Sequence, residues 1–143
     1  MFSKTCEYAI RAMIFIAQKS KQQNKTGIKE IAKEINAPES FIAKILQDLC
    51  RSELLLSSKG PTGGFYLDKN LQQCSLYKIV QVIDGDKLFH GCALGLHSCS
   101  EKKPCPLHNQ FKTVRQDIYD MLKNAKVNEL QGQLENKLAF LKQ

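Results

Sequence analysis

Apolar residues recur at intervals of three and four along most of the chain, the spacing of helices that bury one face. In a first helix, before the polar run Lys19 to Lys25, these residues are Ala9, Met13, Ile16 and Ala17. Thr26 can cap a second helix, and Pro38 suits the start of a third. The inward residues of the third helix are expected to be Phe41, Ile42, Ile45, Leu46 and Leu49. Only Asn36 and Ala37 separate the second and third helices, so the pair predicts a helix-turn-helix.

Two short apolar runs surround a glycine-rich loop after the third helix. Leu54 to Leu56 precede the loop, and Phe65 to Leu67 follow it. The loop reads Lys-Gly-Pro-Thr-Gly-Gly over residues 59–64. This arrangement predicts a β-hairpin. A hairpin directly after a helix-turn-helix is the wing of a winged helix-turn-helix.

The second half predicts a fourth helix, an irregular segment and a long helix. Ser75 can cap the fourth helix, which Gly85 ends. The long helix, from Leu107 to Ala125, carries a narrow apolar stripe typical of a helix that packs along a partner, although packing against its own domain is an alternative. The residues expected at a dimer interface are Phe111, Val114, Ile118, Met121 and Leu122.

The expected fold is therefore mainly α with a small β-hairpin wing. Residues 1–84 form a winged helix-turn-helix, with the wing at about 54–67. Residues 85–106 form a cysteine-bearing loop, and residues 107–143 form a dimerisation helix and a C-terminal segment.

Composition fits one folded domain with a polyanionic partner. The 143 residues are 43% hydrophobic, enough for a core, and the formal net charge is +7. This charge suits DNA, although a solvated basic surface explains it equally well. The longest apolar stretch, Tyr8 to Ala17, is too short to span a bilayer, and no secretion signal is recognisable. We therefore expect a cytoplasmic protein with no membrane partner.

The start of the third helix and the wing are the candidate DNA contacts. A helix-turn-helix presents the N-terminal part of its second helix to the major groove. Ser40 and Lys44 lie four residues apart on one face there and can donate hydrogen bonds to bases or phosphates. Lys59 at the wing tip suits a phosphate or a narrow minor groove. Pro61 and the neighbouring glycines let the wing backbone approach the duplex.

Three of the six cysteines lie in the irregular segment. Six residues separate Cys92 from Cys99 and five separate Cys99 from Cys105, with His108 following. In a reducing compartment, clustered cysteines more often bind metal or act in redox chemistry than form disulfides. Thiolates suit iron–sulfur clusters, whereas structural zinc sites usually pair ligands two to four residues apart. The spacing favours an iron–sulfur cluster over zinc or a metal-free loop.

Several motifs together resemble the Rrf2 family of winged helix-turn-helix transcription regulators, which has IscR-like, NsrR-like and RirA-like branches. They are Tyr8 to Met13, Ile31-Ala32, Lys59 to Phe65 and the three-cysteine loop. The resemblance implies a homodimer, paired through the long helix, that binds a pseudo-palindromic DNA operator. It also implies a 2Fe–2S or 4Fe–4S cluster whose binding or loss changes DNA affinity. We therefore expect a repressor that senses cluster status, iron or nitric oxide.

The resemblance also assigns site residues. By position, the family's DNA contacts fall on Ser40, Ala43, Lys44, Lys59 and Pro61. Ala43 lacks the carboxylate of the IscR branch, which argues against an IscR-like operator preference.

The resemblance leaves two candidates for the fourth cluster ligand beside Cys92, Cys99 and Cys105. His108 matches the IscR-like ligand by its offset from Cys105. Glu7 matches the acidic ligand of the NsrR branch, which comes from the other subunit. Ligation by Glu7 would connect the cluster to the partner's DNA-binding domain, and this connection slightly favours Glu7.

Two other functions are alternatives. A winged-helix regulator could use the loop as a metal-free thiol switch. A small redox or metal-binding enzyme would need a paired thiol or a base beside a nucleophile, and the sequence shows neither a CxxC motif nor a triad. We therefore expect no enzymatic activity. Cys50 and Cys74 are expected to be packing residues, and a role for Cys6 has little support.

Overall fold

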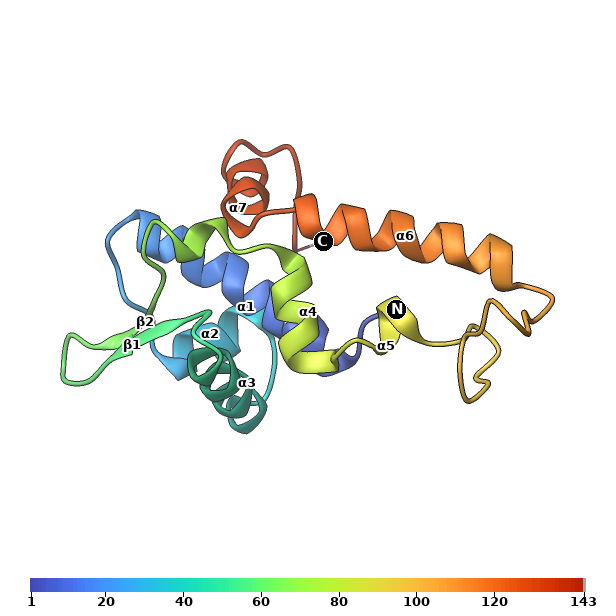
Figure 1. The fold of residues 1–143 in the computed structure, drawn as a ribbon. Coiled ribbons are helices and arrows are strands. Elements are labelled where there is room, and N and C mark those ends of the chain that lie inside the picture. Colours follow the sequence, from blue (N-terminus) through green and yellow to red (C-terminus); the bar gives the residue numbers. More distant parts are fainter. Residues whose placement is uncertain (143) are drawn as a thin grey trace.

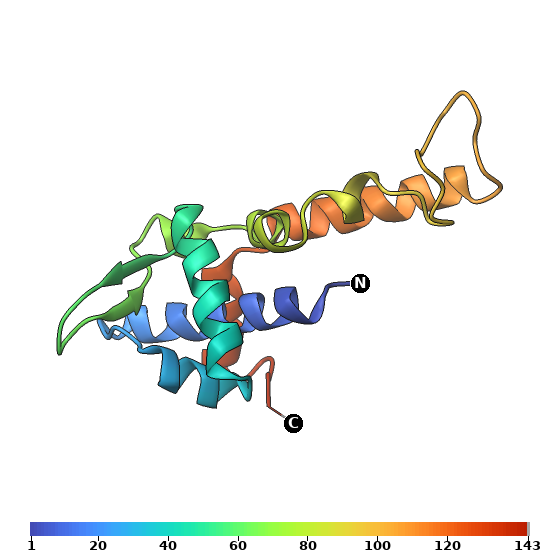
Figure 2. The same ribbon diagram turned by 90° about the horizontal axis from the view of Figure 1, so that it is seen from below.

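The computed structural model describes residues 1–142 and confirms a mainly helical fold with a hairpin wing. The wing lies at one end of the molecule and the cysteine loop at the other (Figure 1, Figure 2). The helices are α1 (Lys4–Lys21), α2 (Ile28–Ile35), α3 (Glu39–Arg51), α4 (Leu76–Asp84), α5 (Lys87–His90), α6 (His108–Asn124) and α7 (Val127–Glu135). The remaining elements are β1 (Leu56–Ser58), β2 (Gly64–Tyr66) and the 3₁₀ turn η1 (Leu71–Gln73). Residue 143, the end of the expected C-terminal segment, lies outside the described residues.

The main core forms around α1, which packs against α2, α3, α4 and α7. Fully buried residues on α1 include Ala9, Ala12, Met13 and Ile16. Burying a side chain the size of Ile16 contributes about 1.5–3 kcal/mol. Arg11 on the same helix donates a hydrogen bond of 2.6 Å to the Ile35 carbonyl, a group at the C-terminal end of α2 that lacks a helical partner. α1 therefore fixes the position of the helix-turn-helix.

The turn between α2 and α3 confirms the predicted helix-turn-helix. Asn36 adopts a left-handed conformation (φ 54°), and the Ala37 N–H donates to the Ala32 carbonyl over 3.0 Å. These features end a helix because they satisfy its last carbonyls. Pro38 then holds the N-cap position of α3.

The hairpin pairs with Thr26, and this pairing corrects the expectation that Thr26 caps α2. The N-cap residue is Gly27, without a side-chain cap. The Thr26 N–H donates to the Phe65 carbonyl over 3.0 Å, and the Phe65 N–H donates back over 2.8 Å. Gly64 has φ 142°, and a Cβ there would lie 2.9 Å from the Thr26 carbonyl oxygen. Pairing with β2 thus holds Thr26 in the wing, one residue before the cap.

Phe41 is a second correction, because it is 56% exposed rather than inward. The buried residues of α3 are Ile42, Ile45, Leu46 and Leu49, which step by three and four. Phe41 precedes Ile42 by one residue and is therefore rotated by about 100° from that face. A continuous apolar run in the sequence concealed this rotation.

α6 projects away from the body, and only one side of it packs within the chain (Figure 2). Its C-terminal half packs on α4 and joins a second cluster of buried residues, Cys6, Val80, Phe89 and Leu122. Leu122 is 1% exposed, and Ile118 is half-buried against this cluster. The expectation that Leu122 lies at a dimer interface is therefore wrong, because Leu122 is already buried within its own subunit. The exposed apolar residues of α6 are Phe111, Val114 and Met121.

The segments on either side of α6 each contain a short helix. α5 lies within residues 85–106, where few regular elements were expected, and the buried Phe89 anchors it to the second cluster. After α6, Val127 N–H donates to the Cys74 carbonyl and α7 packs on α1. Within residues 1–142, no helix is both long and apolar enough to cross a membrane.

Replacing Leu122 by Ala is expected to lower the free energy of unfolding by about 2–5 kcal/mol, because it leaves a cavity in the second cluster. Asp117→Ala, an exposed change on the same helix, should stay within about 0.5 kcal/mol of the parent protein. Denaturant unfolding followed by circular dichroism measures both. Equal stabilities for the two variants would contradict the packing of α6 on α4.

Candidate DNA-binding surface and cysteine site

The start of α3 and the wing face each other across a shared groove. Ser40 and Ala43 line it from α3, and Ser58, Gly60 and Gly63 line it from the wing. A Cβ at Gly63 would lie 2.3 Å from the Ser58 carbonyl oxygen, so this wing turn requires glycine. The structure thus brings the two sequence-predicted DNA-contact regions to one face.

The other predicted contacts lie beside this groove. Lys44 is exposed one helical turn after Ser40. Lys59 and Pro61 are exposed in the loop that joins β1 to β2. The positive side chains therefore flank a groove whose walls are small residues and backbone, a shape and charge that suit a duplex.

Lys29 is a candidate contact that sequence reasoning missed. It lies in the first turn of α2, is exposed, and lines the same groove. Gly27 leaves this helix without a side-chain cap, so its first N–H groups are free to meet an anion. The signal in the sequence was a lysine at the start of this helix, and the expected Thr26 cap concealed that the helix start is uncapped.

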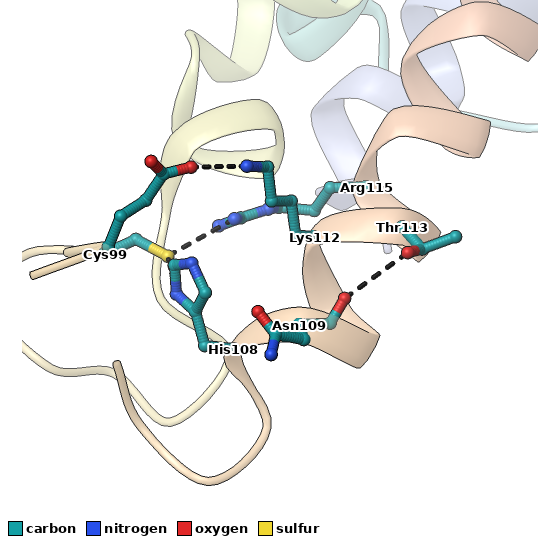
Figure 3. A network of polar contacts seen from close by, with 7 residues as sticks. Cys99, His108, Asn109, Lys112, Thr113 and Arg115 are labelled. Carbon is teal, nitrogen blue, oxygen red and sulfur yellow. Dashed lines mark hydrogen bonds and ion pairs between the residues drawn. The ribbon is translucent and has the colours of Figure 1, made fainter. Parts of the chain in front are cut away.

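The cysteine loop folds back onto the first turns of α6 (Figure 3). Cys99 Sγ lies 3.3 Å from His108 Nδ1 and accepts a hydrogen bond of 3.3 Å from Arg115 Nη2. The Cys105 side chain lies close to Cys92. The backbone N–H groups of Leu94 and Leu96 contribute most to lowering the pKa of Cys92 below its usual value. The three cysteines are all half-buried.

One face of α6 supplies the polar side chains that hold this loop. His108, Lys112 and Arg115 are spaced by four and three residues, so they project on the same side. Lys112 forms an ion pair with Glu101, and Arg115 also donates to the Gly91 carbonyl. Sequence reasoning missed Lys112 and Arg115, although their spacing from His108 was visible.

Of the two candidate fourth ligands, one lies beside the loop within a single subunit. His108 is buried, with 7% of its surface exposed, and contacts Cys99. Glu7 lies in the first turn of α1 and forms an ion pair with Lys4 at 3.2 Å.

The other three cysteines lie elsewhere. Cys74 is buried in the main core, and Cys50 packs against its edge. Cys6 is fully buried, and burial, together with the Asp84 carboxylate, raises its pKa to about 12. A thiol so hard to deprotonate is a poor nucleophile or ligand in its folded surroundings.

The donor set in the loop suits an iron–sulfur cluster. Three thiols and an imidazole, with an arginine beside them, provide soft ligands and positive charge. Within residues 1–142, no group of three or more such side chains is already arranged around one metal position. The loop would therefore have to rearrange to bring the three thiols to a common centre.

Comparison with known proteins identifies the family. A family model described as Rrf2, iron-dependent transcriptional regulator, matches residues 2–133. A candidate HTH-type transcriptional regulator of Aquifex aeolicus is 30% identical over 91% of this chain and 90% of that protein. The HTH-type transcriptional regulator IscR of Pectobacterium atrosepticum is 26% identical over 86% of this chain and 74% of that protein.

A solved structure shows the same fold. The structure of CymR, the global cysteine regulator of B. subtilis, has a TM-score of 0.75 at 20% identity, covering 92% of this chain and 96% of CymR. The family and these relatives are transcriptional regulators, so the enzyme alternative does not apply. The winged helix-turn-helix architecture and the match to nearly the whole chain establish that this protein belongs to the Rrf2 family of transcriptional regulators.

Proposed function

We propose that this Rrf2-family protein is a homodimeric repressor whose DNA affinity depends on an iron–sulfur cluster held by Cys92, Cys99 and Cys105. The observation that carries this proposal is the folding of the cysteine loop onto the start of α6, where Cys99 meets His108. The description of the family as iron-dependent supports it.

The DNA-binding part of the proposal uses the groove between α3 and the wing. Ser40 and Lys44 would donate hydrogen bonds to base edges or phosphates. The Ala43 methyl would make an apolar contact with the methyl group of a thymine. Lys59 would neutralise a phosphate at the wing, with the Pro61 backbone close to the duplex. A homodimer places two such surfaces on two half-sites.

The sensing part uses the loop's thiols. When bound, the cluster supplies iron that oxygen or nitric oxide can attack and that is lost when iron is scarce. Protein residues then carry the change toward the DNA. Phe89 of α5, just before the loop, packs with Val80 of α4 and Cys6 of α1. A rearranged loop would therefore act on helices that hold the helix-turn-helix.

We favour His108 over Glu7 as the fourth ligand. His108 is buried beside Cys99, so ligation needs no second subunit. We expect the protein purified without oxygen to be brown, with iron and sulfide in equal amounts and a visible absorption band. His108→Ala should change the spectrum and lower the iron content, whereas Glu7→Ala should leave both unchanged. The reverse pattern assigns the ligand to Glu7, and a colourless parent protein without iron contradicts the cluster.

A metal-free thiol switch is the second candidate. It is favoured by the proximity of Cys105 to Cys92 in the same loop, because an oxidant such as peroxide could join these two thiols with loss of two electrons and two protons. The structural likeness to a cysteine regulator is compatible with it. Mass spectrometry after peroxide treatment of the iron-free protein tests this function. A Cys92–Cys105 disulfide that changes DNA affinity, in a protein that takes up no iron, would establish it in place of the cluster.

Lys59→Ala is expected to weaken DNA binding across all sequences and to reduce its salt dependence, because one phosphate contact is lost. Ser40→Ala and Lys44→Ala should instead change preference at particular base positions by about 1–3 kcal/mol. Fluorescence anisotropy with duplexes selected by the protein from a random pool measures these effects. Lys87→Ala, an exposed change on α5, is the control. Unchanged affinity in all three test variants would contradict the proposed DNA surface.

A further inference from the structure

Arg115 lies at the centre of the contacts that hold the cysteine loop. It follows His108 by seven residues, or two helical turns, so both side chains project from the same face of α6. Its guanidinium donates one hydrogen bond to the Gly91 carbonyl and another, of 3.3 Å, to Cys99 Sγ. Figure 3 shows the arginine directed at the Cys99 sulfur from one side and His108 from another.

These two hydrogen bonds tie separate parts of the loop to one rigid element. Gly91 ends α5 and precedes Cys92, whereas Cys99 lies in the middle of the loop. The planar guanidinium has five N–H donors in a fixed arrangement, so it can satisfy both acceptors at once. A lysine at this position could satisfy only one of them well.

The charge of Arg115 has a second consequence. Thiolate ligands bring excess negative charge into a half-buried loop, and such charge is costly without compensation. Lys112 is nearby but is paired with Glu101 rather than with a sulfur. Arg115 touches a sulfur directly.

We propose that Arg115 is a positioning residue of the sensor: it holds the start and the middle of the cysteine loop on α6 and compensates charge at the Cys99 sulfur. The part concerning a bound cluster rests on the proposed function. Hydrogen bonds to cluster sulfurs and nearby positive charge stabilise the reduced, more negative state, which raises the reduction potential. Arg115 therefore orders the loop in the iron-free protein and raises the potential of a bound cluster.

Hydrogen–deuterium exchange of the iron-free protein tests the first role. In Arg115→Gln, amides of residues 91–99 should exchange about threefold faster or more, while α1 to α4 are unchanged. Arg115→Lys should also speed exchange in this segment, because it cannot bridge both acceptors. Lys112→Gln is the matched control for residues 91–99, since it removes a positive charge from the same helix face and frees only Glu101, which lies outside that segment. Parental exchange of residues 91–99 in Arg115→Gln would overturn the proposal.

Redox titration of the reconstituted cluster, followed by visible absorption, tests the second role. Arg115→Gln should move the midpoint to a more negative potential than Lys112→Gln does, and Arg115→Lys should restore most of the parental value because the charge is kept. Equal midpoints in Arg115→Gln and the parent would overturn the charge role. If the parent takes up no cluster, the proposed function fails, whereas the exchange experiment still decides whether Arg115 positions the loop.

Discussion

Replacing both Phe111 and Val114 by Asp is expected to convert the protein into folded monomers and to lower its DNA affinity by about 100-fold or more. Both side chains are exposed on α6 and belong to the apolar stripe that the sequence predicts at a dimer interface. Buried charge in an apolar interface is costly without a partner. A monomer also loses the second half-site contact, which the dimer makes at high effective concentration. Sedimentation and anisotropy measure the two effects.

The choice of these two positions comes from the structure. Ile118 and Leu122 share the stripe but pack inside their own subunit, so an Asp there would unfold the chain rather than separate a dimer. Thr113→Asp with Gln116→Asp is the matched control, because it adds the same charge at exposed positions on the opposite side of α6. A Phe111/Val114 variant that remains dimeric would place the interface elsewhere.

Cys99→Ala is expected to lose the cluster entirely. Cys99 is the cysteine that both His108 and Arg115 contact, so its removal takes away a ligand and the attachment of the loop to α6. Iron and sulfide counting after anaerobic reconstitution should give near-zero values, and the DNA affinity of the variant should equal that of the iron-free parent.

Cys50→Ala and Cys74→Ala are the controls for this result, because both thiols belong to the main core and lie outside the loop. Each should keep the parental iron content, although Cys74→Ala should cost some stability. A Cys99→Ala protein with the parental spectrum would contradict the assigned ligands.

Local pattern predicted the DNA-binding half well because its signals are short-range. Helical spacing fixed which faces of α1 and α2 are buried, Asn36 and Pro38 marked the turn, and the glycines marked the wing. The errors at Thr26 and Phe41 have different causes. Each residue suited a local role, and a neighbour distant in sequence or a rotation about the helix axis decided otherwise.

The fold class, the order of helices and wing, and the residue types at the candidate DNA contacts and in the cysteine loop can be read from the chain alone. Those follow from periodicity, turn residues and cysteine spacing, which are properties of neighbouring positions. Three features depend on packing in three dimensions: the side of α6 that stays exposed, the burial of Leu122 inside its own subunit, and the contacts of His108 and Arg115 with Cys99. The sequence of a helix shows which residues share a face, because its surface repeats regularly. Which face is buried depends on α4 and the cysteine loop, which pack against α6 from distant parts of the chain.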